Sequence, residues 1–226
     1  MFFVSFLKIF CYNLSMEILE KLFGSSAKVK IMRLFLSNEE VSFENADISK
    51  RAKVSVNSIR KELNNLNKIG LIKNKIFYKE IEKKIKKTKT KPAEIKIIKK
   101  KVNGWILDEK FPYLIPLQNL LVNMNTFASS SALKKLNNTG KLKLIVISGV
   151  FIQDPDSRVD LLVVGDKIKS GSLDNAIKIL ESEIGRELRY VVFETHDFKY
   201  RMNVYDKLVR DIMDYPHQKI INRLGL

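Results

Sequence analysis

The sequence predicts an α+β protein in which a basic, helix-rich N-terminal half precedes a small α/β layer. Three observations predict this class. Residues 43–70 have the spacing of two helices joined by a tight turn. Residues 71–107 contain strand-forming segments around a lysine-rich stretch. Residues 142–148 and 159–164 are nearly continuous apolar runs, which are typical of strands buried on both faces.

The distribution of charge indicates which half meets a polyanion. The net charge is +16 and the pI is near 9.8, which favours nucleic acid first and a membrane surface second. Residues 1–110 hold 25 Lys and Arg against 12 Asp and Glu, whereas residues 111–226 hold 16 against 13. A biased genome composition also produces many lysines, so the location of the charge is more informative than its size.

The first residues have an unusual composition. Residues 1–15 are apolar but interrupted by Lys8, and they lack the basic region and small-residue cleavage site of a signal peptide. An ordinary amphipathic segment begins at Met16. We interpret Met16 as the natural start and residues 1–15 as an N-terminal extension that is not native. A short membrane-associating or dimer-packing helix is the alternative.

Several classes of site are excluded by residue counts. The single cysteine, Cys11, allows no disulfide within the chain and no thiolate metal cluster. Two histidines are too few for a histidine-built metal site. No apolar run reaches the roughly 20 residues that span a bilayer. We therefore expect a cytoplasmic protein with no cofactor, no metal and no membrane partner.

Three helices are expected in the first half. The first covers residues 27–37, and its broad apolar face consists of Val29, Ile31, Met32, Phe35 and Leu36. The second carries Ile48 and Ala52 and is followed by a turn at Lys53-Val54. Ser55 is a good N-cap for the third helix, which Gly70 ends.

The third helix, Ser55–Ile69, is one-sided. Its predicted apolar stripe consists of Val56, Ile59, Leu63 and Leu66. Its other face carries amides, hydroxyls and cations, with one acid, Glu62, on the flank. Such side chains reach base edges and phosphates together. The candidate DNA-binding residues are Ser55, Asn57, Ser58, Arg60, Lys61, Asn64 and Lys68. An ordinary amphipathic surface helix is the alternative.

A basic hairpin is expected after this helix. Thirteen lysines and three acids lie between Lys73 and Lys101. We expect hairpin arms near 71–79 and 95–107, a tip at Lys83–Lys91, and a further tight turn at Asn103-Gly104. A helix-turn-helix followed by a strand and a basic hairpin is a winged helix, whose wing contacts the DNA backbone. The candidate phosphate contacts are Lys83, Lys84, Lys86 and Lys87; a solvated lysine loop is the alternative.

The second half is expected to begin after a helical linker at residues 111–140. Helices are predicted in the linker at 114–123 and 130–136. The α/β domain, 141–226, is predicted to contain strands at 142–148, 159–164 and 188–193 and helices at 173–184, 204–213 and 217–224.

The first half resembles a known family. The stretch LFGSSAKVKIMRLFL…ISKRAKVSVNSIRKELNNLNKIGLI is similar to the winged-helix domains of ArsR/MarR-type transcription regulators. The resemblance covers about residues 16–110. It implies a winged helix-turn-helix that binds double-stranded DNA.

The second half resembles another family. The stretch IVISGVFIQDPDSRVDLLVVGD, residues 145–166, is similar to the nucleotidyltransferase fold of the polymerase β type. That family has a strand ending in Gly-Ser or Gly-Gly, then Asp-x-Asp on the next strand, then a third carboxylate. These carboxylates hold two Mg²⁺ ions around the triphosphate. The resemblance assigns a vestigial nucleotide site to Ser148, Gly149, Arg158 and Asp160.

This sequence departs from the catalytic pattern. Gly149 matches, but Val150 stands where the family has Ser. Arg158 replaces the first carboxylate of Asp-x-Asp, and a cation there would repel divalent ions. Glu194 is a candidate for the third carboxylate, away from the position of the motif. We therefore expect no catalytic residue.

Together these features favour a sequence-specific, DNA-binding transcriptional regulator. Its C-terminal domain is expected to be a degenerate nucleotidyltransferase-like domain for sensing or oligomerisation. A nucleotide or a protein is the expected effector of this domain, and a homodimer is left open. One alternative is an active nucleotidyltransferase tethered to nucleic acid by its winged helix. Another is a winged helix that mediates protein contacts.

Overall fold

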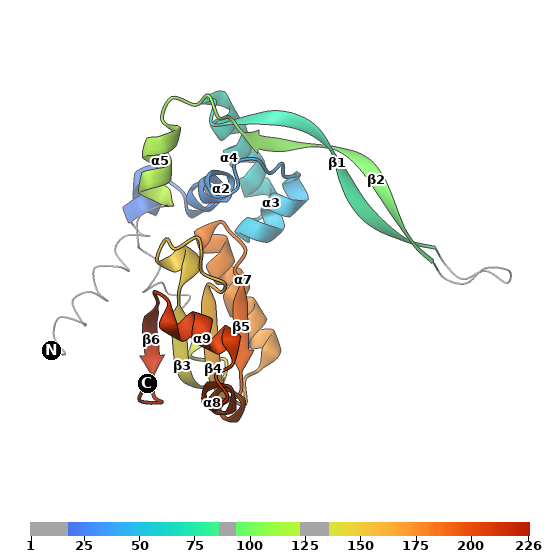
Figure 1. The fold of residues 1–226 in the computed structure, drawn as a ribbon. Coiled ribbons are helices and arrows are strands. Elements are labelled where there is room, and N and C mark those ends of the chain that lie inside the picture. The colour runs from blue at the N-terminus through green and yellow to red at the C-terminus, as the bar shows by residue number, and fades with distance from the viewer. Residues whose placement is uncertain (1–17, 86–93, 123–135) are drawn as a thin grey trace.

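The chain forms two packed bodies, one helical with a long hairpin and the other built on a sheet (Figure 1). The computed structural model describes residues 18–85, 94–122 and 136–226. Within these residues the fold is mixed α+β, as the sequence predicts. The first body contains a two-stranded sheet and the second a four-stranded sheet.

Three helices form the centre of the first body: α2 (Ser26–Leu36), α3 (Asn45–Ala52) and α4 (Val56–Lys68). Side-chain caps fix two of their starts. Ser25 accepts a hydrogen bond from the backbone N–H of Lys28, and Ser55 accepts one from that of Ser58. Lys53 has a φ of 51° and ends α3 in the left-handed conformation, so the predicted turn between the helices is confirmed.

The apolar stripe of α4 packs into the core of the first body. Ile59, Leu63 and Leu66 are buried, as their spacing predicts. Val56 is 46% exposed, so its placement in the buried stripe is wrong. Helical side chains point back toward the N-terminus, and Val56 is the first residue of α4, so its side chain extends past the end of the helix.

Helix α2 is enclosed by its neighbours. The predicted apolar face is buried, and so are Arg33 and Leu34. Helices α3, α4, α5 and α7 all contact α2. The helix expected at 27–37 is therefore central to the first body.

The hairpin consists of β1 (Ile72–Ile85) and β2 (Glu94–Leu107), paired antiparallel from Ile72–Leu107 to Ile85–Glu94. Strand β1 extends six residues beyond the predicted arm, which ended at residue 79. The predicted turn at Asn103-Gly104 is wrong, because both residues lie inside β2. Gly104 serves a different purpose: a Cβ there would overlap the backbone of Phe43, which bridges to β2 at Trp105.

Helix α5 (Leu114–Leu121) follows the hairpin and falls within the predicted helix at 114–123. It contacts α2, and Leu121 is buried in the core of the first body. Most of the helix predicted at 130–136 lies outside the described residues.

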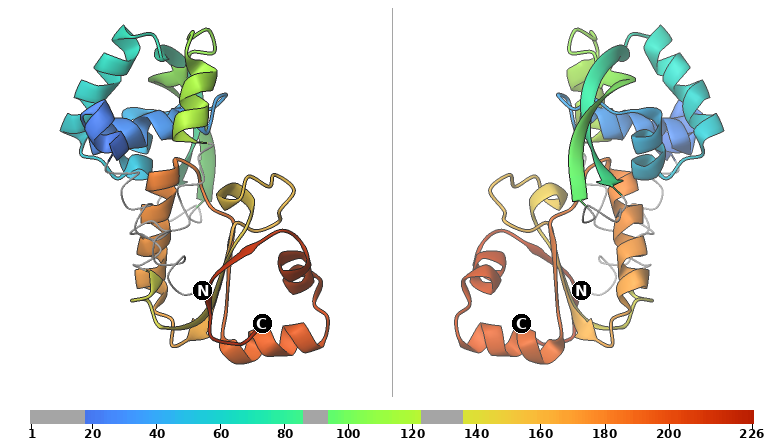
Figure 2. Two further views of the ribbon diagram at one scale, coloured as in Figure 1. Left: turned by 90° about the vertical axis from the view of Figure 1, so that its left-hand side faces the viewer. Right: turned by 90° about the vertical axis from the view of Figure 1, so that its right-hand side faces the viewer.

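The second body is a sheet covered on both faces. Its strands are β3 (Lys141–Ile147), β4 (Leu161–Asp166), β5 (Tyr190–Phe193) and β6 (Gln218–Asn222), in the order β5-β4-β3-β6. Strand β4 is parallel to β5, and β3 is antiparallel to β4 and to β6. Figure 2 shows α7 (Ser170–Ile184) on one side and α8 (Thr195–Asn203) and α9 (Lys207–Asp214) on the other. This double cover explains the continuous apolar runs of β3 and β4.

Two parts of this body differ from the prediction. The helix expected at 204–213 is α9, which begins at Lys207, whereas α8 before it was not predicted; Tyr205, between the two helices, has a φ of +54°. Asp206 starts α9 as an N-cap that accepts from the backbone N–H groups of Leu208 and Val209. The helix expected at 217–224 is strand β6, which pairs with β3.

The two bodies meet where α2 and α3 contact α7. Arg33, fully buried, donates from Nε to the carbonyl of Leu121 at 2.8 Å and from Nη1 to that of Glu183 at 2.9 Å. Asn38 donates to the carbonyl of Gly185 at 2.8 Å. Gly185 has a φ of +83° and lies against the backbone of Arg33, which leaves no room for a Cβ. Polar contacts at helix ends therefore fix this junction.

A search of the described helices finds none with the length and apolar character needed to cross a membrane.

Candidate nucleic-acid interface

The outward face of α4 is exposed over its whole length. The side chains predicted to bind DNA, Ser55, Asn57, Ser58, Arg60, Lys61, Asn64 and Lys68, all lie on the surface. The structure therefore presents every sequence-predicted residue of this helix on one continuous face, opposite the buried Ile59, Leu63 and Leu66.

The two serines also have local partners. The Oγ atoms of Ser55 and Ser58 are 2.9 Å apart, and Ser55 Oγ accepts from the Ser58 N–H at 3.4 Å. Ser55 is therefore partly engaged in capping α4. The other predicted residues of this face are Asn57, Arg60, Lys61, Asn64 and Lys68.

The single acid of α4 is turned away from this face. The side chain of Glu62 is 9% exposed, where the sequence placed it on the flank. Its Oε1 accepts from Ser25 Oγ at 3.0 Å, and its Oε2 lies 3.7 Å from Lys28 Nζ. The outward face thus keeps its cations without a carboxylate of its own.

The cations of α4 are available to a partner. Within the described residues, Arg60, Lys61 and Lys68 form no ion pair with a carboxylate. An exposed cation without a counter-ion in the protein attracts phosphate by Coulomb interaction.

The hairpin extends away from the helices as an arm (Figure 1). Fourteen residues in each strand give it a length of roughly 45 Å. Lys83 and Lys84 belong to β1, whereas Lys86 and Lys87 lie outside the described residues. Lys100 and Lys101 are exposed on β2 and were not among the predicted phosphate contacts. The predicted arm at 95–107 already contained both lysines, so its length was the signal that could have identified them.

One hairpin lysine has a structural role. Lys79 Nζ lies 2.5 Å from Glu44 Oε1 and 2.7 Å from Asp47 Oδ1, so it joins β1 to the start of α3. Hydrogen bonds to Asp47 and Glu44 raise the pKa of Lys79 above its ordinary value. This contact fixes the base of the arm.

The predicted nucleotide site of the second body is only partly assembled. Ser148, Gly149 and Asp160 lie together where β3 ends and β4 begins, but Arg158 turns to Asp211 of α9, at 3.0 Å. Ser148 Oγ donates to the carbonyl of Val159. Gly149 has a φ of +53°, and a Cβ there would overlap the Asp160 carboxylate.

Both oxygens of Asp160 are used inside the protein. Oδ1 accepts from the Val150 N–H at 3.0 Å, and Oδ2 accepts from the Arg189 N–H at 2.8 Å. The Arg189 guanidinium adds contacts at 3.3 Å to each oxygen. Arg189 was not singled out from the sequence, where it lay inside the strand predicted at 188–193. Its guanidinium lies against the carboxylate that a metal ion would need.

The third carboxylate suggested by the sequence lies elsewhere. Strands β4 and β5 are parallel, with Leu161 beside Tyr190 and Val164 beside Phe193. Asp160 precedes β4, whereas Glu194 follows β5, so the two acids lie at opposite ends of the sheet. Instead, Glu194 Oε2 lies 3.4 Å from His196 Nδ1.

Comparisons of the chain with protein-family models, with curated proteins and with solved structures found no significant match.

Proposed function

We propose that the protein binds double-stranded DNA in a sequence-specific manner and acts as a transcriptional regulator. The observation that carries this proposal is the outward face of α4, where amides and cations are exposed and the only acid of the helix is buried. Among the residues that the structure describes, these cations have no ion-pair partner. The order α2, α3, turn, α4, β1, β2 supports a winged helix-turn-helix with α4 as its recognition helix.

The chemistry of this face suits base readout. Asn side chains pair with the edge of adenine, and Arg or Lys with that of guanine, in the major groove. Asn57 and Lys61 are one turn apart near the N-terminal end of α4, the end that recognition helices bring to the base edges. The lysines of the hairpin would contact phosphates beside the site, which gives affinity without sequence preference.

The test is selection of duplexes with a randomised core by the full chain at low and moderate salt. We expect one enriched sequence, bound in a salt-dependent manner. Arg60→Glu/Lys61→Glu should abolish enrichment, whereas Lys199→Glu/Lys207→Glu, an equal charge change on α8 and α9, should not. Binding of all duplexes with equal affinity would exclude sequence-specific regulation. Absence of salt-dependent binding would favour a protein-contact role for the winged helix.

We further propose that the second body is a degenerate nucleotidyltransferase-like domain that senses or oligomerises and does not transfer nucleotides. The support is Asp160: its oxygens hold Val150 and Arg189, and Arg158 occupies the place of the first motif carboxylate. An active transferase tethered to nucleic acid is the second candidate, because Ser148, Gly149 and Asp160 do lie together.

A further inference from the structure

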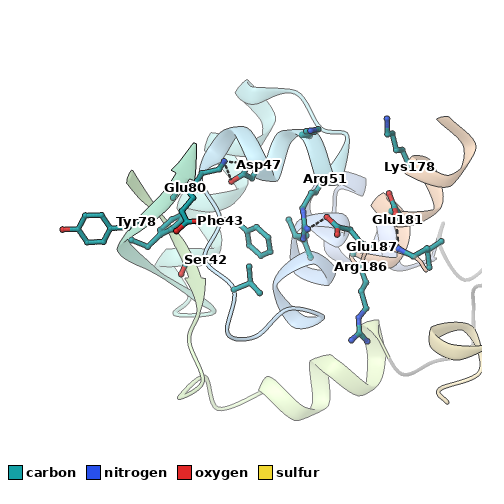
Figure 3. A pocket seen from close by; sticks show the side chains of 17 residues that line it. Ser42, Phe43, Asp47, Arg51, Tyr78, Glu80, Lys178, Glu181, Arg186 and Glu187 are labelled. Carbon is teal, nitrogen blue, oxygen red and sulfur yellow. Dashed lines mark hydrogen bonds and ion pairs between the residues drawn. The ribbon is translucent and has the colours of Figure 1, made fainter. Parts of the chain in front are cut away.

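A groove of about 760 Å³ lies between the two bodies (Figure 3). Its walls come from five places: α2, the 41–43 loop, α3, the middle of β1, and the end of α7 with the loop that follows it. A volume of this size is typical of sites for small organic ligands, which often lie between domains. It is separate from the predicted nucleotide site around Asp160.

The floor of the groove is apolar and partly aromatic. Phe43, Leu34 and Leu188 are almost fully buried beneath it, and Phe77 and the 45%-exposed Val41 complete the surface. The guanidinium of Arg51 lies 5.2 Å from the centre of the Phe43 ring. Rings and a flat guanidinium favour a planar ligand, because planar groups stack on both.

The charges around the groove leave a surplus of cations. Arg51 pairs with Glu187 across the groove (Figure 3), and Lys79 pairs with Asp47. Glu80 pairs with Lys99 of β2 at 3.8 Å, and Glu181 keeps its negative charge while it accepts a hydrogen bond from the backbone N–H of Leu188 at 3.0 Å. The lining thus holds five cations and four carboxylates.

The remaining lining cations are Lys50, Lys178 and Arg186. In the part of the chain that the structure describes, none of the three forms an ion pair with a carboxylate. Figure 3 shows Lys178 and Arg186 on the two sides of the Arg51–Glu187 pair. A negatively charged ligand would complete this rim.

We propose that this groove binds a small planar organic anion, such as a nucleoside monophosphate or an aromatic carboxylate. Its ring would lie on the surface formed by Val41, Phe43 and Phe77, and its anionic group would meet Lys178 or Arg186. Because α3 and the end of α7 both line the groove, an occupant contacts both bodies at once. The inference stands without DNA binding, since it concerns the groove alone.

The test is calorimetric titration of the full chain with four probes: AMP, adenosine, inorganic phosphate and 1-naphthoate. We expect AMP or 1-naphthoate to bind. Adenosine and phosphate should bind at least about tenfold more weakly, because adenosine lacks the anionic group and phosphate lacks the ring. Binding of AMP alone identifies a nucleotide, and binding of 1-naphthoate alone identifies a carboxylate. Trp105, the only tryptophan of the sequence, bridges to Phe43 and provides a second readout by its emission.

Two variants locate the site. Lys178→Glu/Arg186→Glu changes exposed residues and should weaken binding about tenfold, since two attractive charges become repulsive. Lys199→Glu/Lys207→Glu makes the same charge change on α8 and α9 and should bind as the native chain does. The proposal is overturned if neither ring-bearing anion binds, if adenosine binds as tightly as AMP, or if the groove variant keeps native affinity.

Discussion

At the scale of single residues, the burial of Glu62 decides the character of α4. A carboxylate on the outward face would repel phosphate, and at 4 Å in an environment of dielectric constant about 20 that repulsion is about 4 kcal/mol. Glu62 instead bonds to Ser25, the residue that caps α2. One side chain therefore joins α4 to α2 and removes a negative charge from the candidate interface.

Asn57→Ala and Lys61→Ala should each weaken binding to the selected DNA site by about 1–3 kcal/mol, because each removes a base contact. Binding to random duplexes should fall much less. Competition binding at fixed salt measures both. Asn67→Ala, an exposed amide near the other end of α4 that we assign no contact, is the control. Equal losses on both kinds of DNA would mean that Asn57 and Lys61 touch only the backbone.

Asp160 leads to a second prediction at this scale: the protein should transfer no nucleotide. Two carboxylates facing a metal pair are needed for that chemistry, and here Asp160 is bonded to Val150 and Arg189. Radiolabelled ATP, CTP, GTP and UTP, with Mg²⁺ or Mn²⁺ and with protein and RNA acceptors, should give no labelled product. Transfer by the native chain, lost in a folded Asp160→Asn variant, would make the enzyme the better interpretation.

The fold of that variant must be checked, because Asp160 is structural. Asp160→Ala should lower the free energy of unfolding by about 2–3 kcal/mol, since it leaves the Val150 N–H and Arg189 without their acceptor. Denaturant titration measures this loss.

At the scale of elements, the hairpin is held at its base and extends freely beyond it. An isolated two-stranded hairpin is marginally stable in water, so its attachment matters. Phe43 adds two backbone hydrogen bonds to Trp105, each 2.9 Å, and Lys79 bonds to the start of α3. The arm therefore leaves the helices in a direction fixed by α3.

Lys79→Met should lower the free energy of unfolding by about 0.5–1 kcal/mol at pH 7, because it removes the contact with Asp47 and Glu44. The folded state raises the pKa of Lys79, so the contribution is complete below the unfolded value of 10.5 and is lost as the pH rises through the folded value. Urea midpoints of native and variant chains from pH 7 to pH 11 should therefore converge at the alkaline end. A constant difference across that range would contradict this assignment.

Neutralising Lys83, Lys86 and Lys87 to Gln should flatten the slope of log affinity against log salt by about 0.9 for each lysine–phosphate ion pair that the substitutions remove. The enriched sequence should not change, because phosphate contacts carry no base information. Binding measured over a series of salt concentrations tests this. Lys199, Lys207 and Lys219, neutralised together in the second body, are the control. An unchanged slope would leave the lysine stretch as a solvated loop.

The elements differ in how far the sequence could predict them. Helix α4 was predictable because its N-cap and its apolar spacing agree. The failures have local causes: Asn103-Gly104 resembles a hairpin turn, but its glycine is required by the close approach of Phe43. Strand β6 has only the adjacent Ile220 and Ile221 as an apolar signal, and its strand form depends on pairing with β3.

At the scale of the whole molecule, contacts distant in sequence set the arrangement, and these were not predictable. Arg33 lies within an apolar stretch and reaches a carbonyl 150 residues away. The groove likewise joins Val41 to Lys178. Of the candidate sites, only the face of α4 was fully predictable, because one helix supplies all of it.

Arg33 gives the prediction at this scale. Burial lowers its pKa to about 10, so the guanidinium stays charged at neutral pH, and its charge suits the negative C-terminal ends of α5 and α7. Arg33→Met keeps much of the apolar volume but leaves the carbonyls of Leu121 and Glu183 without these donors. We expect a loss of about 2–4 kcal/mol in the free energy of unfolding.

Because Arg33 joins the two bodies, the variant should also change how they unfold. The native chain should unfold in one transition. Arg33→Met should unfold in two, because the two bodies then unfold at different denaturant concentrations. Far-ultraviolet circular dichroism, which reports both bodies, and Trp105 emission, which reports the first, should then give different midpoints. Lys30→Met, on the same helix and half-buried, is the control and should keep coincident transitions. A single transition at the native midpoint in Arg33→Met would show that apolar packing alone couples the bodies.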